Sequence, residues 1–322
     1  MNVPSPNVAI GVRIFTESLS KLEANGFTIR NHPYDQAIQG AELVELAQGA
    51  DALLISASSR VDAKILDQLP NLKVIANIGV GYNNIDVAAA KAKGVQVSNT
   101  PDVLTETTAD LAWALMFAAA RRIPESERWL RAGHWHGLAL DGWLGVDLYN
   151  STLGIIGMGR IGSAVARRAQ GFGMRVLYHN RTQLPVETTP GVTWVDKLTL
   201  LQESDHIVLV VPYSAATHHL IAAKELALMK PTAVLVNIAR GGVVDDVALA
   251  HALRNGQIGA AGIDVFENEP AIAQELLDAP NAVLTPHIGS ASKKTRLGMV
   301  NLAVDNLLDW KAGAPLRNSV MG

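Results

Sequence analysis

The chain contains no cysteine among its 322 residues. This absence excludes disulfide bonds, thiolate nucleophiles and zinc sites built on cysteine. Long hydrophobic runs are missing as well, since the longest apolar stretch, residues 111–120, is followed by two arginines and is too short to span a bilayer. We interpret this stretch as part of a buried helix and expect no membrane as a partner.

Charge of either sign is scarce. Charged residues make up 18% of the chain and the formal net charge is −3. Binding of nucleic acid would need a concentrated basic face, whereas the arginine pairs at 121–122 and 167–168 are expected on solvated helix faces. The N-terminus also lacks the basic segment and apolar stretch of a signal peptide. The sequence therefore favours a cytoplasmic protein that binds a small molecule and no nucleic acid.

The length and the 48% of apolar residues predict two domains with full cores. Short β-rich runs alternate with amphipathic stretches, a pattern typical of parallel α/β layers. We predict two Rossmann-like domains with doubly wound parallel sheets. Residues 102–288 would form one domain. Residues 1–101 and 289–322 would together form a second, discontinuous domain, because a helix from 290 to about 310 is expected to return to it.

A long helix is expected to begin after Pro101, with Asp102 as its N-cap, and to end near Arg122. The Gly- and Trp-rich residues 133–150 are expected to form an irregular connection. Strands are predicted at residues 8–14, 52–55, 73–75, 95–97, 153–157, 174–179, 206–211, 233–238, 259–265 and 282–285.

The segment GMGRIG at residues 157–162 follows an apolar strand and opens a helix. This context makes the G-x-G-x-x-G spacing specific for dinucleotide binding. Gly157 permits the tight turn, Gly159 lets the backbone approach a pyrophosphate, and Gly162 lets the helix pack on the strand. The N-terminus of the helix then offers N–H groups and partial positive charge to the phosphates.

The next strand ends in Asn180, Arg181 and Thr182, without a carboxylate. An NAD site usually has Asp or Glu at this point to accept a hydrogen bond from the ribose 2′-OH. A carboxylate would repel a 2′-phosphate, whereas Arg181 can pair with one, helped by its two neighbours. We therefore predict NADP(H) as the cofactor. Residues 102–288 would be the NADP-binding domain, and residues 1–101 and 289–322 the substrate domain.

Three polar residues, Arg240, Glu269 and His287, lie just past the carboxyl ends of later predicted strands. In open α/β sheets this edge forms the ligand crevice. A guanidinium can hold a carboxylate and polarise a ketone. An imidazolium can protonate the carbonyl oxygen as hydride arrives, and a neighbouring carboxylate orients it and stabilises its charge. These residue types suit the reduction of a 2-oxo acid.

Several segments resemble the D-isomer-specific 2-hydroxyacid dehydrogenases. They run from about residue 50 to 300 in the family's order, and the asparagine–arginine–threonine stretch resembles the glyoxylate/hydroxypyruvate reductase branch, which overlaps with 2-ketogluconate reductases. The segments are NIGVGYNNID (77–86), TPDVLTETTADLAWAL (101–116), GMGRIG, NIARGGVVD, DVFENEP and TPHIGSAS.

The resemblance implies roles for the polar residues. His287 would be the acid/base, Glu269 its partner and Arg240 the substrate anchor. Backbone N–H groups around Val80 and Gly81 would hold the substrate carboxylate.

Trp143 resembles a tryptophan that shapes the substrate pocket in this branch, with packing in the core or at an interface as an equal alternative.

No metal is expected, because His134, His136, His218 and His219 have no evident metal-ligand partners in the sequence. The remaining expected cofactor contacts are Thr107, Arg160, Ile161, Pro212, Ala239 and Asp264.

The sequence thus predicts NADPH-dependent reduction of glyoxylate or hydroxypyruvate. Two alternatives stay open: a reductase of 2-ketogluconate or another 2-oxo acid, and a dinucleotide-sensing, corepressor-like interaction protein. Residues 102–150 form a long apolar arm that in the family builds a homodimer, and we expect the same assembly here.

Overall fold

A computed structural model describes residues 5–32, 36–188 and 190–321. The chain forms two compact units. Unit 1 comprises residues 1–104 and 291–322, and unit 2 comprises residues 105–290. The assignment of substrate binding to unit 1 and NADP binding to unit 2 stays a prediction.

Unit 1 is built on a parallel five-stranded sheet with the order β2-β1-β3-β4-β5. Its inner strands are continuous apolar runs, as expected for strands that are covered on both faces. The strands are β1 (Asn7–Ile10), β2 (Thr28–Asn31), β3 (Ala52–Ser56), β4 (Val74–Ile78) and β5 (Gln96–Ser98). The helices are α1 (Thr16–Ala24), α2 (Gly40–Ala47), α3 (Ala63–Asp67), α4 (Val87–Ala92) and α12 (Lys293–Lys311).

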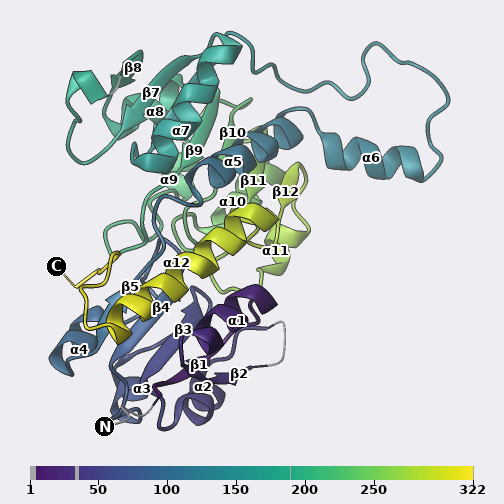
Figure 1. Ribbon diagram of the computed structural model, residues 1–322. Coiled ribbons are helices and arrows are strands. Elements are labelled where there is room, and N and C mark those ends of the chain that lie inside the picture. The colour runs from purple at the N-terminus through teal and green to yellow at the C-terminus, as the bar shows by residue number, and fades with distance from the viewer. Residues whose placement is uncertain (1–4, 33–35, 189, 322) are drawn as a thin grey trace. The chain divides into compact units, whose positions relative to one another are not determined.

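Helix α12 comes from the C-terminal end of the chain and packs on the sheet of unit 1 (Figure 1). Its apolar residues Val304 and Leu307 share one buried cluster with Val8, Ile10 and Leu54 of the N-terminal strands. Burial of this apolar surface is the dominant favourable contribution to folding. The C-terminal segment is therefore part of the core of unit 1.

Unit 2 contains a parallel seven-stranded sheet with the order β12-β11-β10-β9-β6-β7-β8. The order reverses between β6 and β9, which is the topological switch point where open α/β sheets bind ligands. The strands are β6 (Thr152–Ile156), β7 (Arg175–His179), β8 (Val192–Trp194), β9 (His206–Leu209), β10 (Val234–Asn237), β11 (Ala260–Ile263) and β12 (Ala282–Leu284).

Helix α5 (Thr105–Ala120) contacts both β10 and β11 of unit 2 and packs beside α7 (Arg160–Ala169). Close contact with β11 needs glycine, because a Cβ on Gly262 would lie 2.8 Å from the Cβ of Leu115. The remaining helices are α6 (Ile123–Arg131), α8 (Lys197–Glu203), α9 (Ala223–Leu226), α10 (Asp246–Arg254) and α11 (Gln274–Leu277), with short 3-10 turns at Gln170–Phe172 and Val186–Thr188.

The prediction of two parallel α/β domains is confirmed, with local corrections. The first strand ends at Ile10 rather than at residue 14, and Ile14 packs on the core from a loop. Asp102 is not an N-cap: it has φ +70° and lies before the first helical residue, Thr105. Strand β2 was not expected, because its largely exposed residues lack a hydrophobic pattern.

Helix α6 and the irregular connection from 132 to 151 project away from the sheet of unit 2 (Figure 1). The connection leaves large apolar side chains in solvent, with Leu138 87% and Leu140 90% exposed.

In the described part of the chain, no helix has both the length and the apolar character that crossing a membrane requires.

Candidate active site

The glycine loop after β6 has the geometry that its spacing predicts. Gly157 has φ +107°, and a Cβ there would lie 2.7 Å from the carbonyl oxygen of Val210. A Cβ on Gly162 would lie 2.2 Å from the carbonyl oxygen of Gly157. A Cβ on Gly159 would meet nothing within 4 Å, and no side chain caps the N-terminus of α7. The space beside Gly159 and the helix N-terminus together suit a dinucleotide pyrophosphate.

Asn180 joins this loop to the end of β7. Its Oδ1 accepts a hydrogen bond from the backbone N–H of Met158 at 2.7 Å, and its backbone oxygen accepts one from Trp194 Nε1 at 3.2 Å. The neighbouring Arg181 and Thr182 lie in an exposed turn. The structure therefore brings the glycine loop together with the segment that was predicted to select the cofactor.

Glu269 and His287 meet at the carboxyl edge of the sheet. The Oε2 atom of Glu269 lies 2.8 Å from Nδ1 of His287, and its Oε1 accepts a hydrogen bond from the N–H of Phe266 at 2.9 Å. Both side chains stay partly exposed. Because Nδ1 is engaged and no described residue hydrogen-bonds Nε2, the latter nitrogen is the one available to a substrate.

The pKa of Glu269 is held below its ordinary value. Burial alone would raise it, but the hydrogen bond and charge of His287, the N–H of Phe266 and the charge of Arg240 outweigh burial. Glu269 is therefore a carboxylate at neutral pH, and it acts as an acceptor for the Nδ1 proton of His287.

Asp264 fixes the turn that carries His287. Its side chain is 1% exposed and accepts hydrogen bonds from Thr285 Oγ1 at 2.7 Å, from the N–H of Ile288 at 2.7 Å and from the N–H of Gly289 at 2.9 Å. Burial raises the pKa of this carboxyl above its ordinary value despite these bonds. The predicted contact of Asp264 with the cofactor stays a prediction, whereas its bonds to this turn are part of the fold.

Arg240 lies directly after β10, with its guanidinium at the same edge. Its Nη1 donates to the carbonyl oxygen of Ala239 at 2.8 Å, and Ala239 itself is buried. Burial lowers the pKa of Arg240, and the charge of Glu269 opposes that effect. The residue remains a cation, since its ordinary pKa lies far above neutrality.

The other predicted residues lie in several places. Trp143 packs edge-on against Trp129, with the Arg122 guanidinium 4.9 Å from its ring centroid, so it contacts α6 and its flank. Val80 and Gly81 follow β4 in unit 1, and their part in substrate binding stays a prediction. Arg160 and Ile161 begin α7, Thr107 lies in the first turn of α5, and Pro212 follows β9.

One contact at this edge could not be predicted from the sequence. The buried Asp246 accepts a hydrogen bond from the N–H of Glu267 at 3.0 Å and so steadies the segment before Glu269. The motif VVDD contains this aspartate, but its type alone does not distinguish it from a helix cap.

His218 and His219 do have a partner, contrary to expectation. Their rings stack with centroids 3.9 Å apart, and ligand atoms of both lie with one of Glu267 within 4.8 Å of one another. Adjacent side chains share this side because His219 is left-handed, with φ +48°. Hydrogen bonds to Tyr213 at 3.2 Å and to Glu267 at 3.0 Å use one nitrogen of each ring.

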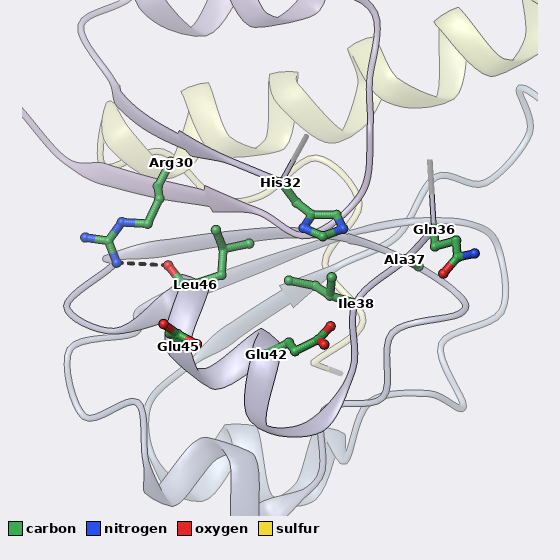
Figure 2. A pocket seen from close by; sticks show the side chains of 8 residues that line it. All are labelled: Arg30, His32, Gln36, Ala37, Ile38, Glu42, Glu45 and Leu46. Atoms are coloured by element: carbon green, nitrogen blue, oxygen red, sulfur yellow. Dashed lines mark hydrogen bonds between the residues drawn. The ribbon is translucent and has the colours of Figure 1, made fainter. Parts of the chain in front are cut away.

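A cavity of about 600 Å³ in unit 1 lies among β2, α2, His32 and residues 36–38 (Figure 2). It contains none of the predicted site residues. Figure 2 shows Arg30 directed to the carbonyl of Leu46, and its Nη1 also donates to Gln48 at 2.7 Å. Arg30 therefore satisfies carbonyl groups at the C-terminus of α2.

Comparisons with known proteins indicate the family of the chain. Residues 113–289 match the NAD binding domain of the D-isomer specific 2-hydroxyacid dehydrogenases. The chain is 48% identical to a glyoxylate reductase of Thermococcus onnurineus over 313 residues, which are 96% of this chain and 93% of the relative.

Solved structures are similar over nearly the whole chain. The TT0316 protein of Thermus thermophilus has a TM-score of 0.91 and 41% identity, covering 98% of this chain and 99% of its own. An NADPH-dependent glyoxylate/hydroxypyruvate reductase of Sinorhizobium meliloti, crystallised with NADP and malonate, has a TM-score of 0.86 and 36% identity, covering 98% of this chain and 97% of its own.

The glycine loop allows a matched pair of substitutions. Gly159→Ala should leave the melting temperature nearly unchanged but weaken dinucleotide binding, because its Cβ meets no protein atom and fills the space for the pyrophosphate. Gly162→Ala should lower the free energy of unfolding by about 1–3 kcal/mol through its clash with the loop backbone. Thermal unfolding and NADPH fluorescence titration measure both effects. Equal melting temperatures for the two variants would contradict this division.

Proposed function

The chain belongs to the D-isomer-specific 2-hydroxyacid dehydrogenase family, and we propose that it reduces glyoxylate or hydroxypyruvate to the corresponding 2-hydroxy acid with NADPH. The observation that carries this proposal is the hydrogen-bonded pair of Glu269 and His287 at the sheet edge that also holds Arg240. The names of the similar proteins support the choice of substrates.

The cofactor site would lie along the glycine loop. Gly159 and the first turn of α7 would hold the pyrophosphate, and Arg181, with Asn180 and Thr182, would bind the 2′-phosphate of the adenosine ribose. The bound dihydronicotinamide would supply a hydride to the carbonyl carbon of the substrate. NADPH is proposed over NADH because no carboxylate follows β7 at residues 180–182.

The protein's own residues would prepare the carbonyl for this transfer. Nε2 of His287 would donate a proton to the carbonyl oxygen, while Glu269 holds Nδ1 and stabilises the positive imidazolium before transfer. Arg240 would bind the substrate carboxylate and polarise the carbonyl. The N–H groups of Val80 and Gly81 in unit 1 are proposed as a carboxylate-binding site.

We also propose a homodimer built on α6 and the connection from 132 to 151. This arm exposes several large apolar side chains in sequence, a surface that a monomer rarely leaves uncovered. The exposed residues are Ile123, Leu130, Trp135, Leu138, Leu140, Leu144 and Tyr149.

The proposed reaction is tested by following NADPH and NADH oxidation at about 340 nm with glyoxylate, hydroxypyruvate and 2-ketogluconate in parallel. We expect turnover with NADPH and a higher kcat/KM for the two small 2-oxo acids. A higher kcat/KM for 2-ketogluconate would identify that compound as the preferred substrate of the same type of reaction. Binding of NADPH without turnover of any 2-oxo acid would contradict the reductase and favour a dinucleotide-sensing protein.

His287→Ala should lower kcat by about 100- to 10,000-fold, the usual contribution of a general acid, while NADPH still binds. Glu269→Gln should give a smaller loss, because an amide oxygen can still accept from Nδ1 but carries no charge. His251→Ala, an exposed histidine on α10, is the matched control and should keep full activity. Retention of kcat in His287→Ala would refute the acid/base role.

Arg181→Ala should weaken NADPH binding by about 10- to 100-fold, since a charge-assisted hydrogen bond to the 2′-phosphate is lost, and should leave NADH binding almost unchanged. Fluorescence titration with each cofactor gives the two dissociation constants. Arg175→Ala, which breaks an exposed ion pair with Glu203 on the same unit, serves as the control. Equal losses for both cofactors would mean that Arg181 does not recognise the phosphate.

A further inference from the structure

In the loop after β4 in unit 1, three successive backbone carbonyl groups each accept a hydrogen bond from the protein. The carbonyl of Gly79 accepts from the N–H of Thr100 at 2.9 Å. The carbonyl of Val80 accepts from Asn99 Nδ2 at 2.8 Å, and that of Gly81 accepts from Asn77 Nδ2 at 2.9 Å. Two of these three tethers are therefore side-chain amides.

The N–H groups of the same loop differ from its carbonyl groups in their hydrogen bonding. Within the described ranges, the amides of Val80 and Gly81 donate to no protein acceptor, and both residues are partly exposed. Successive backbone N–H groups in a turn can form a concave site for an anion. Each peptide plane contains one carbonyl group and the N–H of the following residue. The bond to the carbonyl of Gly79 therefore fixes the direction of the Val80 N–H, and the bond to the carbonyl of Val80 fixes that of the Gly81 N–H. The bond from Asn77 to the carbonyl of Gly81 holds the end of the loop that follows these two amides.

The orientation of the Asn77 amide is itself fixed by a network. Asn84 Nδ2 donates to the carbonyl oxygen of Ser59 at 2.9 Å, which sets the orientation of the Asn84 amide. The same nitrogen lies 3.2 Å from Asn77 Oδ1, so this atom is the acceptor and Nδ2 of Asn77 must face Gly81. Asn77 is fully buried, which makes an unpartnered amide there costly.

The geometry points to Asn99 as a positioning residue that holds the Gly81 amide, and to Asn77 as one that anchors the end of the loop, so that the Val80 and Gly81 amides stay in place for the carboxylate of a 2-oxo acid. This inference rests on the proposed function, because it takes that carboxylate as the anion. Neither side chain needs to touch the substrate, since each acts on a carbonyl oxygen of the loop. Asn77 lies within the motif NIGVGYNNID, and its role follows from the contacts of the folded chain.

The experiment measures three quantities for each variant: KM for glyoxylate, kcat, and the dissociation constant of oxamate, a non-reacting analogue of a 2-oxo acid, with NADP⁺ bound. Asn77→Ala and Asn99→Ala should each raise KM and the oxamate constant by about 5- to 10-fold, as expected for one lost hydrogen bond. Their kcat should stay within about twofold and their NADPH affinity should not change. Asn99→Asp, which keeps the size but replaces the donor by an acceptor, should weaken oxamate at least as much.

Two controls separate positioning from general stability. Asn306→Ala removes another fully buried amide of unit 1, which bonds Leu302 and Asn318, and should lower the melting temperature without changing KM. Ser98→Ala removes a buried hydroxyl, beside Asn99, that has no hydrogen-bond partner among the described residues, and should change neither quantity. If Asn77→Ala fails to fold, the half-buried Asn99 carries the test through its two variants.

The positioning role of the two asparagines and the proposed reaction can fail independently. Oxamate affinity that falls in the Asn77 and Asn99 variants supports positioning even if wild-type protein does not reduce glyoxylate, in which case only the proposed reaction fails. Unchanged KM and oxamate affinity in folded Asn99→Ala and Asn99→Asp would overturn the inference. So would a wild-type protein that binds oxamate no more tightly than the variants.

Discussion

The carboxylate of Asp264 is the constraint on which the candidate site depends. It is buried at the end of β11, where an unpaired charge would be costly, and it is compensated by three hydrogen-bond donors from the segment after β12. These bonds fix the backbone on which His287 adopts φ +51°, a conformation that an ordinary side chain takes only where its surroundings enforce it. The imidazole then reaches Glu269, whose own position is set by the N–H of Phe266.

The parallel sheet of unit 2 explains why residues so far apart in the sequence meet. Each strand delivers its following residues to the same edge, so Arg240, Glu269 and His287 come together although they follow three different strands. The glycine loop belongs to that edge as well, at the reversal of strand order. The ends of these neighbouring strands can therefore bind both a dinucleotide and a small acid.

Much of this arrangement could be predicted from the sequence, because it depends on local patterns. Apolar runs predicted most of the strands, though not β2 or β8, and the glycine spacing predicted the turn before α7. Contacts that depend on tertiary placement could not be predicted. Aspartate is a common N-cap residue, but the backbone conformation of Asp102 is not that of an N-cap. Adjacent side chains normally diverge, whereas the left-handed conformation of His219 places its ring beside that of His218. The link from Asn180 to Met158 needs the three-dimensional proximity of two loops.

The discontinuity of unit 1 has a consequence for how the chain acquires its structure during synthesis. Strands β1 and β3 leave the ribosome before unit 2, but the helix that covers part of their apolar surface is translated after unit 2. Unit 2, by contrast, is continuous in sequence and has all its strands once residue 290 has emerged. The nascent chain therefore completes its second unit before its first. Until then it carries an uncovered apolar sheet, a surface of the kind that chaperones bind.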